Sequence, residues 1–315
     1  MVIVVRRALS LLFLSTVLAT VIPALESRIA IAQVDRSADS YEVFDSFGKH
    51  YFKAPPKRVV VTDWTLLEQL LALEVVPIGA PEVDAYRSVM PINELPSTIR
   101  DIGLREKPTL AIVGQLKPDL IIVGTDQKQL ARPLSRYARV LFYQNFSPRF
   151  NNNGSTAIKR LRQLARVFKQ EPVAEQVIAQ LQGTLEDGRV RIERMNPQPL
   201  RVTLLQTYRE DSFIRFSPHS LHGWVLGELK VENKTQIPIN KFGELRSRTL
   251  SADDLLPGQV ACFGECLAVA DLVDDARARA PARLSPAWPY GGVLTMQRTA
   301  EELIEAFSEP DSARP

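Results

Sequence analysis

The stretch DIGLREKPTLAIVGQLKPDLIIV, residues Asp101–Val123, constrains the fold more than any other part of this 315-residue chain. A short helical segment follows Pro108, a turn follows at Lys117–Asp119, and the stretch ends in an entirely apolar run, Leu120–Val123. An apolar run of this length, reached from a helix through a tight turn, is typical of a parallel strand that is covered on both faces. The stretch therefore predicts a layered α/β fold.

Arg105 lies in the same stretch but outside the predicted helix and strand, between Gly103 and Pro108. Loops held by a rigid scaffold carry a large share of ligand-binding groups. Arg105 is therefore a candidate binding residue.

The alternation of strands and amphipathic helices continues along both halves of the chain. After a hairpin over Tyr41–Phe52, the first half has predicted strands at Val59–Val61, Val75–Gly79, Leu120–Val123 and Val140–Tyr143, with helices from Asp63, over Ile112–Leu116 and over Leu130–Tyr137. The second half has predicted strands at Arg201–Thr207, Ser212–Phe216 and Val260–Phe263, with helices at Pro218–Leu229, Leu250–Leu255 and Thr299–Phe307. Residues 271–289 give no predicted strand. This spacing predicts a mainly parallel sheet in each half.

Between the two halves lies the longest helical pattern. One amphipathic helix ends near Glu171, and a second runs from Pro172 to Arg194, about 35 Å at 1.5 Å per residue. We expect Gly183 and Gly188 to weaken it locally, and expect the helix to act as a strut between two lobes. The predicted organisation is a signal peptide over residues 1–32, an N-terminal α/β lobe over 33–150, a helical connection over 151–196 and a C-terminal α/β lobe over 197–315.

The first residues resemble an export signal. Arg6 and Arg7 precede the apolar stretch Ala8–Leu25, and the small residues Ala30 and Ala32 offer a cleavage site. A membrane anchor is the competing interpretation, but Pro23 and several hydroxyl side chains make this a poor membrane span. The paired arginines also allow twin-arginine export. We expect a cleaved, soluble, periplasmic protein.

Composition and cysteine content exclude few further classes of function. The formal net charge of +3 is too close to neutral to indicate nucleic-acid binding. Cys262 and Cys266 are expected to be buried and chemically idle, although an exported protein also permits a disulfide between them.

No catalytic motif is present in the sequence. There is no G-x-S-x-G elbow, no glycine-rich phosphate loop and no H-E-x-x-H run. Histidines occur at His50, His219 and His222; the last two are three residues apart, but no carboxylate or cysteine ligand is near them in sequence. The sequence therefore favours binding over catalysis, with no metal site.

Aromatic residues and arginines cluster on predicted loops instead. Those in the first half are Trp64, Tyr86, Arg87 and Arg105; those in the second half are Phe242, Trp288, Pro289 and Tyr290. Any one aromatic residue is more typical of a core. Their shared position after strand ends is informative, because ligands of open α/β sheets bind there.

Several of these segments, taken in order, resemble a known family. The chain is similar to the periplasmic binding proteins for iron–siderophore and cobalamin uptake, and among them to the ferric hydroxamate-binding proteins, from about Pro56 to Gly264 and again from Trp288 to the C-terminal helix. The resemblance is carried by PKRVVVTDWTLLEQLLALEVVPIGAPEVDAYR, DIGLREKPTLAIVGQLKPDLIIV, FSPHSL, the FG at 242–243 and LSADDL before VACF. It implies two α/β lobes joined by one long rigid helix, with little domain closure.

The resemblance also implies roles for individual residues. Arg105 matches an arginine that contacts the hydroxamate oxygens around iron, and a guanidinium suits such anionic oxygens. Trp64 matches a tryptophan of the pocket wall, Phe242 stands where a stacking tryptophan is usual, and Tyr290 with Trp288 matches a C-terminal aromatic wall.

The departures from the family pattern bear on the ligand. Gln127 replaces a tyrosine that donates to the ligand, and Val89 and Val123 replace pocket tryptophans. A siderophore that bears carboxylates is thus a further candidate ligand, and Arg87 would be a possible second cation in its site. Of the two acidic residues that dock such proteins on their permease, Asp253 matches one, whereas Arg132 occupies the position of the other. Residues 271–289 are shorter than usual and lack the family's strand, through divergence or a damaged reading frame.

The function expected from the resemblance is capture of a ferric siderophore, of hydroxamate or mixed citrate–hydroxamate type, and its delivery to an ABC permease and its ATPase. The protein would be a monomer without catalytic activity, and it would need no cofactor or metal ligand because the siderophore itself holds the iron. The alternatives are binding of cobalamin, haem or free metal by the same fold, for which Tyr86 and Tyr290 are the available ligands, and an exported α/β hydrolase.

Overall fold

The protein is described from a computed structural model. The structure describes residues 40–90, 95–146, 152–209, 212–235, 240, 242–247, 250, 252–255, 258–264, 281–286 and 288–308. The predicted signal peptide, residues 1–32, lies outside them. The chain divides into two compact units. Among the described residues, the smaller unit comprises most of one β-hairpin. The larger unit contains the turn Phe44–Gly48 and the chain from Pro55 onwards.

The hairpin is the one predicted from the alternation over Tyr41–Phe52. Strands β1 (Tyr41–Phe44) and β2 (Lys49–Phe52) form a two-stranded sheet. The Tyr41 and Phe52 rings lie 6.1 Å apart, and Lys49 forms an ion pair with Glu42 at 2.7 Å.

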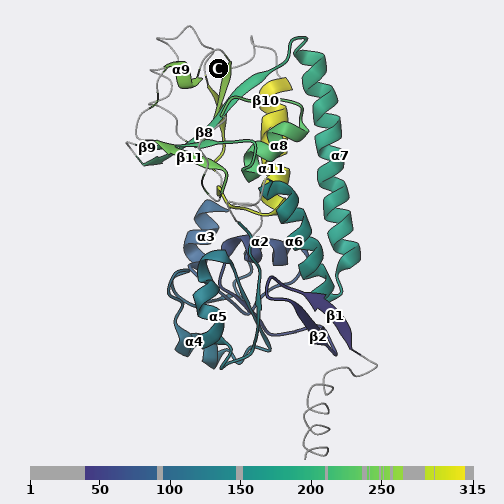
Figure 1. Ribbon diagram of the computed structural model, residues 1–315, viewed down its shortest axis with the longest axis vertical. Helices are drawn as coiled ribbons and strands as arrows, with labels where there is room; N and C mark the ends of the chain where they lie inside the picture. Colours follow the sequence, from purple (N-terminus) through teal and green to yellow (C-terminus); the bar gives the residue numbers. More distant parts are fainter. Residues whose placement is uncertain are drawn as a thin grey trace, which may run out of the picture. The chain divides into compact units, whose positions relative to one another are not determined.

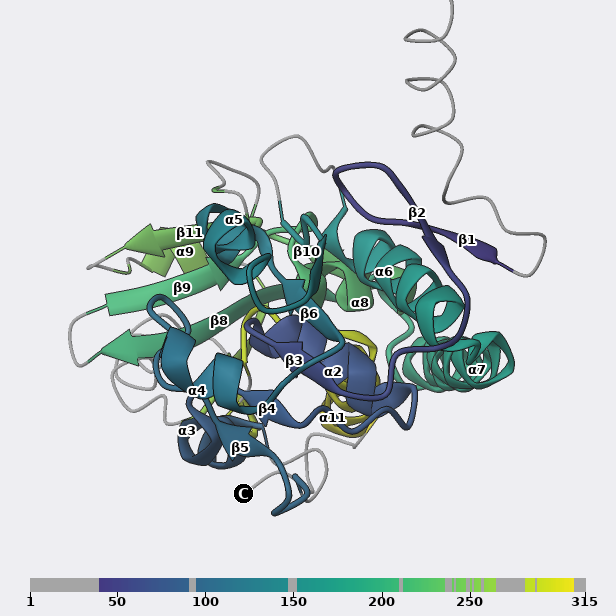
Figure 2. The same cartoon turned by 90° about the horizontal axis from the view of Figure 1, so that it is seen from below.

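The larger unit begins with a five-stranded sheet in which every pairing is parallel (Figure 2). Its order is β5 (Arg100–Asp101), β4 (Gly79–Ala80), β3 (Val59–Val61), β6 (Leu120–Val123) and β7 (Arg139–Phe142). Every residue of β3 and β6 is buried, so both faces of the sheet centre are covered. The helical segments of this first lobe are α2 (Trp64–Ala72), α3 (Val83–Val89), α4 (Leu110–Gln115), η1 (Thr125–Leu130) and α5 (Ala131–Leu134).

Two predictions in this lobe were wrong in extent. The strand expected at Val75–Gly79 begins only at Gly79, because Val75 N–H still bonds to Leu70 O at the end of α2 and Pro77 has no N–H to pair. The helix expected over Leu130–Tyr137 ends at Leu134 and is preceded by the 3₁₀ turn η1.

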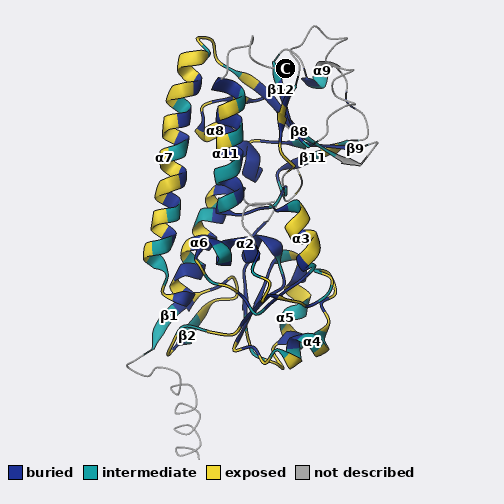
Figure 3. Cartoon of the chain, turned by 180° about the vertical axis from the view of Figure 1, so that it is seen from behind, coloured by how far each residue is buried: buried dark blue, intermediate teal, exposed yellow. Residues whose placement is uncertain are grey.

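Two long helices follow, α6 (Asn153–Phe168) and α7 (Glu171–Met195), and Pro172 lies in the first turn of α7 as expected. Gly188 has a packing role that was not predicted. A Cβ there would overlap Ile304 of α11 (Val293–Ser308), so the glycine allows α11 to approach α7 closely. The opposite face of α7 is exposed (Figure 3).

The second lobe has a six-stranded mixed sheet. Its order is β11 (Glu244–Ser247), β9 (Ser212–Phe216), β8 (Arg201–Arg209), β12 (Gln259–Phe263) and β13 (Ala282–Leu284), and β10 (Glu232–Asn233) also pairs with β8. The pairings made by β9 are antiparallel and the others are parallel. Helices α8 (Leu221–Glu228), α9 (Ala252–Leu255) and α11 accompany it.

Residues 271–289 were expected to contain no strand, and this expectation was wrong. Strand β13 pairs in parallel with β12, with Ala261 opposite Ala282. Only three residues long, with a charged arginine at its centre, β13 carries too weak an apolar signal to be recognised in the sequence. Strands β10 and β11 were missed for the same reason. The predicted fold class is confirmed: two α/β lobes with mainly parallel sheets and one long helix, α7, which lies between them in the sequence and runs along one side of the larger unit (Figure 1).

Candidate binding cleft

A cleft of about 900 Å³ is bordered by loops and strand ends of both lobes in the larger unit. Most of its first-lobe residues follow the carboxyl ends of the parallel strands β3, β5, β6 and β7, where open α/β sheets bind ligands. Its lining residues are Asp63, Trp64, Thr65, Glu82, Val89, Leu104, Arg105, Glu106, Asp126, Gln127, Gln129, Phe146, Gln206, Phe242, Arg246, Trp288, Pro289 and Tyr290.

Arg105 packs against two neighbouring indole rings. Its guanidinium carbon lies 3.8 Å from the centre of the Trp64 ring and 4.7 Å from that of Trp288. Its Nε donates to Glu82, and the side chain keeps 29% of its surface exposed. Stacking and an ion pair together fix the plane of the guanidinium, so Arg105 enters the cleft as an oriented donor.

Trp64 is placed by the local structure at the start of α2. Asp63, the residue before it, caps this helix by accepting from the N–H of Leu66 at 3.0 Å. The indole N–H of Trp64 donates to the carbonyl of Pro81 at 2.9 Å, and its ring is almost completely buried. Trp64 is therefore a rigid part of the cleft wall.

The wall continues through aromatic rings of the second lobe. The Trp288 ring lies 4.9 Å from Trp64 and 5.1 Å from Tyr290, and Tyr290 lies 4.2 Å from Phe242. Phe146, which follows β7 in the first lobe, lies 5.0 Å from Phe242 and 6.0 Å from Tyr290. Rings from both lobes thus form one continuous wall.

Arg246 is a second cation in the cleft, and the sequence did not point to it. It lies on the edge strand β11, donates to the Tyr290 hydroxyl and approaches the buried Glu244 carboxylate at 3.4 Å. Burial raises the pKa of the Glu244 carboxyl and that of the Tyr290 phenol. The signal was absent because β11, with the sequence ELRS, has no clear strand pattern.

Helix α2 of the first lobe anchors the aromatic loop of the second. The hydroxyl of Thr65 donates to the carbonyl of Tyr290, and one turn later the fully buried Glu68 carboxylate accepts from Thr295. The Thr295 N–H and hydroxyl lie 2.7 and 2.8 Å from the two Glu68 oxygens, at the start of α11. Burial raises the pKa of Glu68. The loop between β13 and α11 is therefore fixed against the first lobe.

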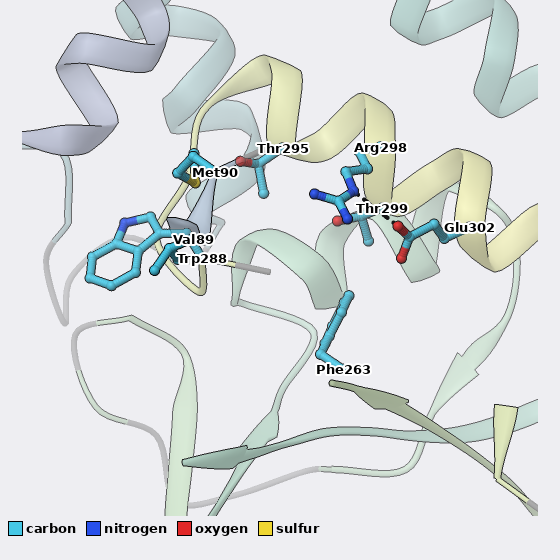
Figure 4. Close-up of a pocket in the computed structure, with 8 residues that line it drawn as sticks. All are labelled: Val89, Met90, Phe263, Trp288, Thr295, Arg298, Thr299 and Glu302. Carbon is cyan, nitrogen blue, oxygen red and sulfur yellow. Dashed lines mark hydrogen bonds and ion pairs between the residues drawn. The ribbon is translucent and has the colours of Figure 1, made fainter. Parts of the chain in front are cut away.

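Behind the Trp288 ring lies a small pocket of about 10 Å³, no larger than a water molecule (Figure 4). Val89 and Met90, at the end of α3, lie beside the indole. Val89 thus borders Trp288, and the pocket is too small to hold a ligand.

Asp63 and Gln127 form the polar floor on the first-lobe side. Besides capping α2, Asp63 accepts from the Asn145 amide at 3.1 Å, and burial raises its pKa to about 6. Gln127, in η1, is 4% exposed, and its Oε1 has no hydrogen-bond partner among the described residues.

Two of the predicted ligand-binding residues, Tyr86 and Arg87, do not line the cleft. Tyr86 is buried behind Trp64, with ring centres 5.5 Å apart. Arg87 was considered as a second cation, but it forms an ion pair with the exposed Asp84 at 2.7 Å and lies outside the cleft. Val123 is buried in β6, and Asp253 lies in α9. Arg132, the position considered for docking, borders a separate surface groove.

The histidines give no metal centre among the described residues, where no group of three or more potential ligands occurs. His222 is buried between the rings of Phe216 and Phe263, and its Nδ1 lies 2.9 Å from the Thr299 hydroxyl. Burial lowers its pKa to about 4. Cys262 is fully buried, as expected, and it is disulfide-bonded, which was the alternative left open for an exported protein; Cys266 lies outside the described residues. In the described part of the chain, no helix combines the length and apolarity needed to span a membrane.

Comparisons with known proteins agree with a binding cleft. No family model matches the chain. It is 29% identical to the iron(3+)-hydroxamate-binding protein FhuD of Escherichia coli over 68% of this chain and 71% of that protein. It is 23% identical to the Fe(3+)-citrate-binding protein YfmC of Bacillus subtilis over 69% and 67% of the two chains. Among solved structures, FhuD of Vibrio cholerae bound to Fe3+–Desferal superposes with a TM-score of 0.74 at 28% identity, over 80% of this chain and 98% of that one.

These homologues and structural neighbours are substrate-binding proteins, not enzymes. The homologues of this chain are siderophore-binding proteins, and the resemblance found in the sequence is thereby confirmed.

Proposed function

We propose that this protein is an exported solute-binding protein that captures a ferric siderophore of hydroxamate or mixed citrate–hydroxamate type in the cleft between its lobes. The observation that carries the proposal is the placement of Arg105 against Trp64 and Trp288, at the centre of a wall built by both lobes. The homologues supply the ligand class, because they include binding proteins for iron(3+)-hydroxamate and Fe(3+)-citrate.

The cleft suits such a ligand in size and chemistry. A volume of about 900 Å³ is within the range of small-molecule sites. The anionic oxygens around iron would accept from the free edge of the Arg105 guanidinium, while the carbon skeleton would pack on the rings of Phe242, Tyr290 and Trp288. The siderophore holds the iron, so the protein supplies no metal ligand in this proposal.

Delivery completes the proposed role. The predicted signal peptide over residues 1–32 would export the protein to the periplasm, where the lobes 33–150 and 197–315 would present the loaded cleft to an ABC permease and its ATPase. Asp253 is the proposed contact of the second lobe. A pull-down of the permease with wild-type protein and with Asp253→Ala would test it; equal recovery would remove Asp253 from the docking surface.

Tryptophan fluorescence offers a direct test of binding, because two of the three tryptophans line the cleft. Ferric hydroxamate, citrate-based and catecholate siderophores are titrated into the protein, and iron close to Trp64 and Trp288 should quench emission. Trp224 is the matched control, since it packs in α8 against Gly154 of α6. Trp224→Phe should retain the quenching. No quenching by any of the three classes would refute the proposal.

Arg105→Ala tests the central contact. Loss of a charge-assisted hydrogen bond in a partly enclosed site should weaken binding by about 2 to 3 kcal/mol, measured by the same titration. Arg87→Ala, which removes an arginine outside the cleft, should leave affinity unchanged. Equal affinities of the Arg105→Ala variant and the wild type would exclude this arginine from the site.

A further inference from the structure

The charges that line the cleft are unequal, and this inequality bears on which ferric complexes fit. The inference rests on the proposed function. Among the described lining residues there are four carboxylates, Asp63, Glu82, Glu106 and Asp126, against two guanidinium groups, Arg105 and Arg246. At neutral pH the lining therefore carries an excess of two negative charges.

Each arginine already faces a carboxylate. Arg105 forms an ion pair with Glu82, and Arg246 lies 3.4 Å from the Glu244 carboxylate. A guanidinium with a carboxylate at its side still donates directional hydrogen bonds, but it offers a ligand little net positive potential. The arginines of this cleft are therefore suited to orienting oxygens rather than to neutralising a polyanion.

The remaining carboxylates of the lining all belong to the first lobe. Glu106 and Asp126 are exposed, and Asp63, at the start of α2, lies near enough to Asp126 for the two carboxylates to interact. They make the first-lobe side of the cleft an acidic rim. A positively charged group on a ligand would be attracted there, whereas a ligand carboxylate would be repelled.

We infer that the cleft selects ferric complexes of zero or positive net charge, such as a trihydroxamate carrying an ammonium group, over polyanionic ferric citrates. In a ferric trihydroxamate, three hydroxamate anions balance the iron charge, so the side groups alone set the net charge. The acidic rim then discriminates among siderophores that present the same iron centre to Arg105.

A charge series built on one iron centre tests the inference. Fe3+–Desferal carries a terminal ammonium, its N-acetyl derivative is neutral, and its N-succinyl derivative carries a carboxylate; the amide of the succinyl group is a neutral control of equal size. We expect affinity to fall about tenfold for each positive charge lost or negative charge gained at low ionic strength. The differences should shrink in 0.5 M NaCl, where screening is stronger.

Protein variants assign the effect to the rim. Glu106→Gln combined with Asp126→Asn should reduce the affinity ratio between the ammonium and succinyl complexes at least tenfold. Asp84→Asn removes a carboxylate whose side chain is 95% exposed and outside the cleft, so it should leave the ratio unchanged.

The outcomes separate this inference from the proposed function. Equal or tighter binding of the succinyl complex than of the ammonium complex overturns the inference. So does tight binding of ferric citrate with none of the trihydroxamates, although siderophore binding itself would then be supported. A protein that binds no member of the series and no other ferric siderophore would refute the proposed function as well.

Discussion

The central strands of the first sheet and the outer strands of the second differ in how completely they are buried. In the first, β3 and β6 are buried at every position, and α4 and α5 supply Val113 and Leu134 to one face. In the second, the outer strands are short and partly polar, as in β11, where Arg246 is exposed. Buried central strands are recognisable in a sequence as uninterrupted apolar runs, whereas short and partly polar outer strands, such as β11 and also β5 of the first sheet, leave little signal.

The same difference extends to the two sides of the cleft. Trp64 and Gln127 belong to the first lobe and follow strand ends that the apolar runs located, whereas Arg105 follows β5, a polar strand that was not predicted. The second-lobe aromatic loop is held in part by groups of the first lobe, through Thr65 and Glu68 of α2. Helix α2 therefore organises both sides.

Truncation of core side chains should give the largest loss of stability and tests whether the two sheets differ in packing. Ile121→Ala, at the centre of β6, removes a fully buried side chain from a cluster that also contains Val60 and Phe142. We expect a loss of about 4 kcal/mol in the free energy of unfolding, measured by urea denaturation. Leu205→Ala in β8, from the smaller cluster with Leu255, should cost less, about 3 kcal/mol.

The matched pair can contradict the comparison. A cost for Leu205→Ala equal to or above that for Ile121→Ala would show that the second sheet is packed as tightly as the first. Both variants need unchanged denaturant slopes, because a changed slope indicates a change in the unfolded or native state rather than in packing.

Glu68→Ala should have the next largest effect, on both stability and affinity. The substitution removes two hydrogen bonds to a buried carboxylate and leaves the Thr295 N–H without its acceptor, at a cost of about 3 kcal/mol in unfolding free energy. Siderophore affinity should also fall, because the Trp288–Tyr290 loop loses its fixed position.

Glu68→Gln is the control, since its amide oxygen still accepts from the Thr295 N–H and its NH₂ can donate to the hydroxyl. It should recover much of the affinity. If affinity is unchanged in the alanine variant while stability falls, α2 stabilises the lobes without positioning the cleft wall, and the two sides of the cleft are independent.

Part of the fold and of the site could be predicted from the sequence. The parallel framework, Trp64, Arg105 and the second-lobe aromatics follow from local patterns and from the resemblance. Arg246 could not be predicted in this way. It lies on β11, which pairs with β9 through backbone hydrogen bonds, and the mixture of polar and apolar residues in this four-residue strand gives no strand pattern in the sequence. The contact between Glu68 and Thr295 joins residues 227 positions apart, and in the sequence Glu68 is one polar residue on an amphipathic helix. Such tertiary pairs have no local signature.

The pH dependence of stability should give the smallest effect and test the first-lobe side of the cleft alone. Burial raises the pKa of Asp63 from 3.8 to about 6. A carboxyl whose pKa is raised on folding contributes stability below its unfolded pKa, and this contribution is lost as pH rises toward the folded value. The wild type should therefore lose about 2 kcal/mol relative to Asp63→Asn between pH 3.8 and about 6, less than the full shift implies because Asp63 is partly exposed to the cleft.

Asparagine is a suitable replacement because it caps helices as well as aspartate does, so the cap on α2 should be retained. Because asparagine does not titrate, the pH dependence of stability that comes from Asp63 should be lost. Urea denaturation of both proteins at intervals across this window measures the difference. A difference that stays constant with pH would mean that Asp63 is as well solvated in the folded protein as in the unfolded chain. The first-lobe edge would then be an open surface, and the contrast drawn between an enclosed first lobe and a more open second lobe would not extend to the cleft.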